Sequence, residues 1–385
     1  MIKLIDISFF ANTEFAGGID AINAFKPAFG YIDFIKGRLD IQVIKHAGRE
    51  ETLIYQGVQF SFFKGRNRLW HIPFKTFSYV KKQEPGIVIV QGIGFPLQVL
   101  MLRFTLGRSC AIIVQHHAER PLRGIKKTLQ KMADKCIDAY LFTTGKNAEE
   151  WYDEGIIDNA AKYNELLELS TYFSRLDKKQ SRKKLGMGDN DIFLWVGRLE
   201  ANKDPITVLK GFEKYVSSRP SAILYMVYQE DQLLPEVKKM MTESIFLNRS
   251  VRLIGKIERD ELPAWFSAAD FYLSGSHREG SGTALIEAMA CGCIPVVTNI
   301  PSFSSITAGG QHGILYTPGD AESLSGALKA LDKIDKENFS ANVVSHFEKK
   351  LSFKAIADDL YEICMKIRNG RKLSHAADEV AGTSL

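Results

Sequence analysis

Two glutamates stand eight residues apart in the stretch GSHREGSGTALIEAMACGCIPVVT, residues 275–298. Glu287 is the one charged residue in the apolar run from Thr283 to Val297, and a buried carboxylate without partners is strongly destabilising. Glu279 precedes a turn that contains glycine. A carboxylate only accepts hydrogen bonds, whereas adjacent hydroxyls of a sugar donate them in pairs. The pattern favours a ribose ligand for Glu287 and a second sugar for Glu279. The simpler alternatives are a salt bridge to an arginine and an exposed loop acid.

The stretch GRLEANKDP carries two cations between a strand-like run and a helix. Arg198 ends the strand-like run, and Lys203 lies in the loop before the helix. Asp204 is expected as the N-cap of that helix and Pro205 at its first position. Two cations beside the free backbone N–H groups of a helix start suit a diphosphate. Solvated loop cations are the simpler alternative.

The EGSG turn offers a second possible anion site. Free backbone amides open the next helix there, and such amides stabilise an anion. They belong to Ser281, Gly282 and Thr283, with Gly280 in the same turn.

Other chemically useful residues also follow strand-like stretches. Gly17 and Gly18 follow IKLIDISFF, and His116 and His117 follow CAIIVQ. Ligands of open parallel sheets bind beyond the carboxyl ends of the strands. Neighbours along a strand point to opposite faces, so we expect only one of the two histidines to enter a cleft. Glu119 is a further candidate on the acceptor side.

The elements that position these residues alternate between strand-like and helix-like stretches, which is typical of a parallel sheet covered by helices. The pattern restarts at IFLWVG after a charged segment that is poor in apolar residues. At 385 residues the chain exceeds the size at which one core usually stops growing. We therefore expect an α/β fold with two Rossmann-like domains. Their expected bounds are 1–173 for the first domain, 174–191 for the linker, 192–350 for the second domain, 351–369 for a C-terminal helix that packs back on the first, and 370–385 for a disordered tail.

Composition narrows the function classes. The net charge of +5 is too small to indicate nucleic-acid binding, but it is compatible with an anionic substrate. Five cysteines form no CxxC pair and leave one unpaired in any disulfide scheme, so we expect reduced thiols in a cytoplasmic protein. No apolar run approaches the ~20 residues of a membrane span. No Asp-rich metal motif is visible, and we expect no metal.

A basic helix is expected over residues 122–136. Apolar residues at helical spacing should face the core, namely Leu122, Ile125, Leu129, Met132 and Cys136. The remaining face carries Arg123, Lys126, Lys127, Lys131 and Lys135. This face is either simply solvated or a surface for anionic phospholipid or a lipid-pyrophosphate acceptor, because each cation near an acidic leaflet contributes ~1 kcal/mol. The second interpretation places the protein at the inner face of the cell membrane.

Together, GRLEANKDP and EGSGTALIEAMACGCIPVV resemble the signature of the retaining nucleotide-sugar glycosyltransferases of family 4. The E-x7-E spacing, the AMA-x-G helix end and the IPVV strand match in order. The resemblance covers about Ile192 to Leu331 and is looser in the first half. It implies the GT-B fold, in which two Rossmann-like domains have parallel sheets that face across a cleft. It also implies sugar transfer from a UDP- or GDP-sugar to a glycan or lipid-linked acceptor, with retention at the anomeric carbon and without a cofactor.

The resemblance implies roles for the residues named above. Arg198 and Lys203 would bind the donor diphosphate, and Glu287 would bind the ribose. Glu279 would contact the transferred sugar, and the backbone around Lys256 and Ile257 would meet the nucleobase.

In the first domain, the resemblance implies that the loop at Gly17 and Gly18 approaches the phosphates. His117, favoured over His116, would hydrogen-bond the donor sugar near the reacting carbon. One departure from the family is Ser281, which stands where the family often has phenylalanine, so the sugar pocket is expected to differ in shape.

Two other functions fit the same residues. A GT-B sugar-nucleotide epimerase would need no acceptor, and a nucleotide-sugar-binding protein would retain the cations and glutamates without turnover. Formation of product with an acceptor separates both from a transferase.

Overall fold

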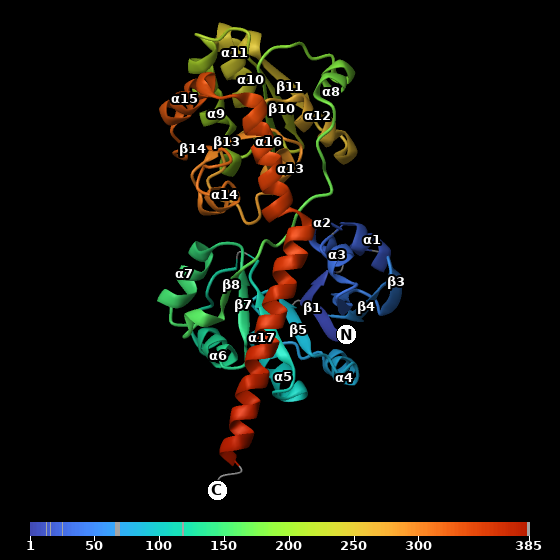
Figure 1. Cartoon of the computed structure of the whole chain (residues 1–385). Helices are drawn as coiled ribbons and strands as arrows, with labels where there is room; N and C mark the ends of the chain where they lie inside the picture. Colours follow the sequence, from blue (N-terminus) through green and yellow to red (C-terminus); the bar gives the residue numbers. More distant parts are fainter. Residues whose placement is uncertain (13, 16, 25, 66–69, 118, 383–385) are drawn as a thin grey trace. The chain divides into compact units, whose positions relative to one another are not determined.

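The computed structural model describes residues 1–382 except 13, 16, 25, 66–69 and 118 (Figure 1). The chain forms two compact units. Unit 1 contains Met1–Leu169 and Phe353–Leu385, and unit 2 contains Ser170–Ser352. Both are α/β units built on largely parallel sheets, which confirms the expected fold class.

The sheet of unit 1 has the strand order β3-β4-β2-β1-β5-β6-β7-β8. Its strands are β1 (Ile2–Asn12), β2 (Leu39–Ala47), β3 (Glu51–Tyr55), β4 (Val58–Lys64), β5 (Ile87–Gln91), β6 (Ala111–Gln115), β7 (Ala139–Phe142) and β8 (Tyr163–Glu165). All neighbours run parallel except the β3–β4 hairpin. The order reverses beside β1, so its carboxyl end lies at the switch point where such sheets bind ligands.

Helices cover both faces of this sheet. They are α1 (Gly18–Ala24), α2 (Lys26–Phe29), α3 (Ile32–Ile35), α4 (Phe74–Lys82), α5 (Pro96–Leu106), α6 (Ile125–Asp134), α7 (Gly145–Asp153) and α17 (Phe353–Gly382). Alternate strand residues point to opposite faces, which gives two cores. Leu4 lies in the core that contains Phe353 of α17, whereas Ile5 lies in the core that contains Leu102 of α5 and Trp151 of α7.

The sheet of unit 2 is parallel throughout, with the order β11-β10-β9-β12-β13-β14. Its strands are β9 (Ile192–Gly197), β10 (Ile223–Tyr228), β11 (Val251–Gly255), β12 (Phe271–Ser274), β13 (Ile294–Thr298) and β14 (Ile314–Tyr316). Its helices are α8 (Lys178–Leu185), α9 (Pro205–Val216), α10 (Leu234–Glu243), α11 (Ile245–Ser250), α12 (Leu262–Ala268), α13 (Thr283–Ala290), α14 (Pro301–Ile306), α15 (Ala321–Ala330) and α16 (Lys336–His346). The switch point lies between β9 and β12.

The segment expected as a linker, residues 174–191, is part of unit 2 instead. It contains α8, which packs against α12. Asp270 pairs with Lys178 and Arg182 of α8, and the second pair has a distance of 2.7 Å. The charged character of this segment therefore comes from a helix that is fixed by ion pairs.

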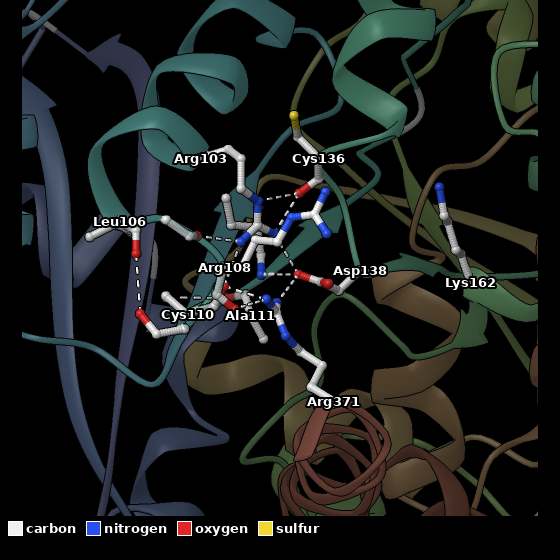
Figure 2. A network of polar contacts seen from close by, with 12 residues as sticks. Arg103, Leu106, Arg108, Cys110, Ala111, Cys136, Asp138, Lys162 and Arg371 are labelled. Carbon is white, nitrogen blue, oxygen red and sulfur yellow. Dashed lines mark hydrogen bonds and ion pairs between the residues drawn. The ribbon is translucent and has the colours of Figure 1, made fainter. Parts of the chain in front are cut away.

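Helix α17 continues to Gly382, whereas residues 370–385 were expected to be a disordered tail. Figure 2 shows one contact that holds this part of the helix. The Asp138 carboxylate accepts hydrogen bonds from Arg371 at 2.5 Å, from Arg103 at 2.7 Å and from the Ile112 amide at 2.7 Å. Because Arg371 lies beyond residue 370, these bonds fix to the rest of unit 1 a part of the helix that was expected to be disordered.

No helix in the described part of the chain combines the length and the apolar character that a membrane span requires.

Candidate functional site

Unit 2 has a cavity of about 290 Å³ at the carboxyl ends of its central strands. The sequence-based candidates that line it are Arg198, Lys203, Ile257, Glu279, Gly282 and Thr283. Side chains that sequence reasoning missed also line it, namely Tyr228, Gln229, Tyr272 and Phe303. Since β9 and β12 flank the switch point, residues that follow them converge although they are far apart in the chain.

The loop that carries Lys203 has a fixed backbone. Asp204 has a φ of 41°, which is unusual for a residue with a side chain, and its carboxylate caps α9 by accepting from the Thr207 amide at 3.0 Å. Pro205 begins α9, as expected. A Cβ at Gly275 would lie 2.8 Å from the Asp204 carbonyl oxygen, so glycine is needed after β12 for this close approach.

Both cations of the cavity are paired with carboxylates. Lys203 pairs with Glu279, and these side chains are only 20% and 16% exposed. Arg198 is half-exposed and lies 2.8 Å from Glu200 and 4.0 Å from Glu230. An anionic ligand would therefore have to displace Glu279 from Lys203, or Glu200 and Glu230 from Arg198.

Glu287 is buried in α13 and pairs with Arg259. This ion pair is the salt bridge to an arginine that we gave as the simpler alternative to a ribose ligand for Glu287. Burial raises the pKa of the Glu287 carboxyl, and the Arg259 guanidinium partly opposes the rise. Arg259 also lies over the Phe173 ring at 5.3 Å. Glu287 is not among the residues that line the cavity. Because its carboxylate is already paired with Arg259, a ribose would have to replace Arg259 as its partner.

The turn before α13 contributes unevenly to the cavity. Gly282 has a φ of 62°, and a Cβ there would lie 2.8 Å from Ile306, so the turn requires glycine. Gly282 and Thr283 line the cavity, whereas Gly280 and Ser281 are not among its lining residues. The Ser281 hydroxyl lies 3.4 Å from that of Thr283.

The glycine pair of unit 1 packs against the β3–β4 hairpin. The Gly18 amide donates to Glu51 at 2.9 Å, and a Cβ at Gly18 would lie 2.7 Å from Phe62. A Cβ at Gly17 would lie 2.7 Å from Arg49. The packing accounts for Gly18 but not for Gly17, because the exposed Arg49 side chain can move away, and the Gly18 amide already has a carboxylate partner.

Unit 1 has a cavity of about 370 Å³ that His117 and Glu119 line. Its other polar lining includes Asp6, Lys45, Gln91 and Glu168, all of which sequence reasoning missed. His116 points elsewhere: it is buried against Phe142, with ring centroids 4.9 Å apart, and its Nε2 lies 2.9 Å from the Glu119 carbonyl.

Both ring nitrogens of His117 have partners. Nδ1 lies 2.5 Å from Glu168 and Nε2 lies 2.7 Å from the Gln91 Oε1 atom. Burial lowers the pKa of His117, but the hydrogen bond and charge of Glu168, together with the charge of Glu119, outweigh it and raise the pKa above its ordinary value. A ligand that hydrogen-bonds to this ring would have to displace Glu168 or Gln91.

Glu119 holds backbone amides in place. Its carboxylate accepts from Ile93 at 3.1 Å and from His117 at 2.5 Å. It therefore fixes the loops after β5 and β6 at the rim of the cavity.

The expected core face of the basic helix is wrong at Ile125 and Met132, whereas Cys136 packs against the core as expected. Ile125 is 74% exposed and Met132 is 50% exposed, whereas Gln130, Ala133 and Asp134 are buried. Buried polar contacts set this orientation: Asp134 accepts from Lys162 at 2.8 Å and from Tyr140 at 2.9 Å. The helix therefore presents apolar side chains to solvent together with its lysines.

Within the described residues, no group of three or more His, Cys, Asp or Glu side chains is arranged to hold a metal ion. All five cysteines are free thiols.

Comparison with known proteins shows that most of unit 2 resembles one family. Residues 177–343 match the model of the family described as glycosyl transferases group 1. D-inositol 3-phosphate glycosyltransferase 2 of Catenulispora acidiphila is 26% identical over 182 residues, which is 44% of this chain and 42% of that protein. Mannosylfructose-phosphate synthase of Agrobacterium fabrum is 29% identical over 154 residues, 38% of this chain and 34% of that protein. The chain thus matches less than half the length of these curated relatives.

Solved structures share the fold over nearly the whole chain. A glycosyltransferase from Rickettsia africae has a TM-score of 0.71 at 13% identity and covers 95% of this chain and 98% of its own. HepE of Anabaena, solved in complex with UDP, has a TM-score of 0.67 at 15% identity, with 95% and 100% coverage. The fold of the chain is that of GT-B glycosyltransferases.

Proposed function

We propose that this chain, in which residues 177–343 match glycosyl transferases group 1, transfers a sugar from a nucleoside diphosphate-sugar to an acceptor. The observation that carries the proposal is the cavity of unit 2. Two cations from the loop after β9, Arg198 and Lys203, and a carboxylate from the loop after β12, Glu279, line it together. Relatives named for glycosyl transfer and for sugar-phosphate synthesis support the same reaction class.

The residues of this cavity suit the two parts of a donor. Lys203 and Arg198 bind the diphosphate and stabilise the charge that develops on the leaving phosphate. When the diphosphate takes Lys203 as its partner, Glu279 is released to accept hydrogen bonds from the transferred sugar. Gly282 and Thr283 bring the start of α13 to the same anion, with Gly280 and Ser281 ahead of them in the turn.

The nucleoside occupies the neighbouring part of unit 2. The backbone at Ile257 meets the base, and Glu287 accepts from the ribose hydroxyls once Arg259 leaves it. UDP or GDP is the proposed nucleotide, and the complex of Anabaena HepE with UDP supports a uridine nucleotide for a protein of this fold.

Transfer proceeds with retention at the anomeric carbon in this proposal, as in family 4, and the two cations take the role that a divalent metal has elsewhere. His117 approaches the donor sugar near the reacting carbon after exchanging its Gln91 contact. The loop at Gly17 and Gly18 serves the phosphates from unit 1. The acceptor is a glycan or a lipid-linked glycan.

Free thiols support a cytoplasmic location, and the exposed residues of α6 support contact with the membrane surface.

Binding of nucleotides tests the proposal directly. UDP, GDP, ADP and dTDP, each alone and as sugar conjugates, should be compared by thermal shift of the full chain, because a ligand of the native state raises stability in proportion to its affinity. We expect one nucleotide to stabilise the protein strongly and its sugar conjugate to be consumed only when an acceptor is added. Consumption of donor without acceptor would identify an epimerase or hydrolase, and binding without any consumption would identify a binding protein.

A further inference from the structure

The ring of His117 lies between a carboxylate and an amide in unit 1. Its Nδ1 atom is 2.5 Å from the Glu168 carboxylate, and its Nε2 atom is 2.7 Å from the Gln91 Oε1 atom. Both partners line the same cavity as the ring. Because each ring nitrogen has one partner, the number of protons on the ring follows from what the two partners can donate or accept.

The Gln91 amide is held in one orientation by Asp6 of β1. The Gln91 Nε2 atom donates to Asp6 Oδ2 at 2.8 Å, and the same oxygen accepts from the Tyr31 hydroxyl at 2.8 Å. With its NH2 group on this carboxylate, Gln91 presents its carbonyl oxygen to His117. A carbonyl oxygen only accepts hydrogen bonds, so His117 carries a proton on Nε2.

The other ring nitrogen also faces a group that accepts. An ionised Glu168 has no proton to donate, so the short contact at Nδ1 requires a proton on the ring. With protons on both nitrogens, His117 is an imidazolium cation paired with the Glu168 carboxylate. The two side chains are only 30% and 22% exposed, so solvent screens the pair incompletely.

The charges around the ring favour its cationic form. Burial lowers the pKa of His117, but the hydrogen bond and charge of Glu168, together with the charge of Glu119, raise it above its ordinary value against the opposing charge of Lys45. The ring therefore stays charged at a pH where an ordinary histidine is neutral. The titratable side chains that line the cavity with His117 are Asp6, Tyr31, Lys45, His46, Glu119 and Glu168.

We propose that Glu168 is a positioning residue that keeps His117 doubly protonated, so that the ring meets a ligand only as a hydrogen-bond donor. The effect on turnover rests on the function proposed above, whereas the protonation of the ring does not. A cationic ring cannot serve as a general base, and it binds an oxygen that accepts, such as a hydroxyl or phosphate oxygen of the donor. The ligand replaces Gln91, because the bond to Glu168 is charge-assisted and therefore the stronger of the two.

Nitrogen NMR of the full chain with isotope-labelled histidine tests the protonation without any substrate. The signals of His117 are those lost in His117→Gln. We expect both ring nitrogens of His117 to be protonated at about pH 7.5 in the wild type. In Glu168→Gln the new amide can donate to Nδ1, so we expect a neutral ring with its proton on Nε2. A neutral ring in the wild type would overturn the proposal whether or not the variant folds.

The pH dependence of turnover tests what the charged ring contributes. Between about pH 6 and 8 the wild type should show no loss of kcat from His117, whereas kcat of Glu168→Gln should fall about 10-fold as pH rises, because its ring loses the charge. Acid should restore the variant. The matched control is Glu165→Gln, since Glu165 accepts from the Tyr163 hydroxyl at 2.9 Å and is not among the residues that line the cavity. Parallel profiles of Glu168→Gln and the wild type would contradict the role of Glu168.

The two measurements separate this inference from the transferase proposal. If a nucleotide-sugar is consumed with an acceptor while His117 is neutral in the wild type, the inference fails and the transferase proposal stands. If the ring is charged in the wild type and neutral in Glu168→Gln, but no nucleotide-sugar binds or is consumed, the transferase proposal fails. The control of the His117 protons by Glu168 stands in that case.

Discussion

Lys203 and Glu279 neutralise each other at the cavity of unit 2, so each controls what the other can bind. Lys203→Ala removes one of two cations from the proposed diphosphate site. We expect turnover to fall at least ~100-fold, the scale of losing one group that stabilises charge in the transition state. Steady-state kinetics measures this, with exposed Lys210→Ala on α9 as the control. Turnover near that of the wild type would remove Lys203 from the mechanism.

Glu279→Gln should have opposite effects on binding and on turnover. Removing the carboxylate frees Lys203, so UDP or GDP without a sugar should bind about 3- to 10-fold more tightly, the scale of one competing ion pair. Turnover and discrimination between donor sugars should fall, because the sugar loses its acceptor. Glu322→Gln is the matched control, since Glu322 pairs with Lys214 on the surface. Weaker binding of the bare diphosphate to the Glu279 variant would contradict the exchange of partners.

Glu287 makes the stability of unit 2 depend on pH. Its pKa in the folded state is raised by burial, so between its ordinary value and the raised one the folded protein binds more protons than the unfolded protein. Stability therefore falls as pH rises through that window. We expect Glu287→Gln to raise the melting temperature of unit 2 at neutral pH, with a gain that disappears under acidic conditions. Arg259→Gln should lower it at neutral pH, because a buried carboxylate is left unpaired. Melting curves across pH measure both, and shifts of the same sign would refute this account.

Arg198, Lys203 and Glu279, which line the unit 2 cavity, could be predicted to lie together because they follow strands of one parallel sheet, and the carboxyl ends of such strands converge. In the unit 1 cavity only His117 and Glu119 could be predicted, and Asp6, Lys45, Gln91 and Glu168 could not. Asp6 and Lys45 lie within strands whose sequences are mostly apolar. Their place in the cavity depends on side-chain contacts such as the hydrogen bonds from Tyr31 and Gln91 to Asp6, which the sequence does not show. The one available signal was a carboxylate in the middle of IKLIDISFF.

Helix α6 shows the limit of apolar spacing as a guide to the core. Periodicity predicted the helix but assigned Ile125 and Met132 to the wrong face. Asp134, a residue that spacing would place on the surface, is buried and paired with Lys162. An internal ion pair thus set the rotation of the helix, and sequence spacing does not report such partners.

The exposed face of α6 gives an element-scale prediction. Its apolar side chains can insert into a membrane surface while Lys126, Lys131 and Lys135 meet anionic headgroups. We expect binding to vesicles that contain anionic lipid, weakening as salt rises. Charge reversal at Lys126 and Lys131 should remove the salt-dependent part, and Ile125→Ser with Met132→Ser should remove the remainder. Lys81→Glu on α4 is the control. Unchanged sedimentation of the reversed variant with vesicles would show that the face is only solvated.

At the scale of the whole molecule, the alternation of strands and helices was enough to predict two α/β units. The boundary between the two units was harder to predict. Helix α8 is rich in lysine and arginine and therefore resembles a linker, but Asp270 of unit 2 pairs with its Lys178 and Arg182. The C-terminal end was misjudged for a similar reason: the partner of Arg371 lies 233 residues earlier in the chain.

Arg371 should therefore contribute to the stability of unit 1 although it lies in the second half of α17. Its side chain and that of Asp138 are only 18% and 22% exposed. Arg371→Gln should destabilise unit 1 by about 1–2 kcal/mol, the scale of a lost charge-assisted hydrogen bond, and leave unit 2 unchanged. Urea unfolding followed separately for the two units measures this, with exposed Arg368→Gln as the control. Equal effects of the two substitutions would show that the Asp138 contact contributes nothing.

The division of unit 1 between two distant stretches of the chain also sets an order of events during synthesis. Unit 2 is continuous from Ser170 to Ser352, so a nascent chain can fold it as soon as that stretch has left the ribosome. Unit 1 cannot close its core at that stage, because Phe353, Ile356 and Leu360 fill it and are translated after unit 2. One apolar face of the unit 1 sheet therefore stays uncovered while unit 2 folds. During this interval a chaperone, or a neighbouring nascent chain, can bind to the uncovered face.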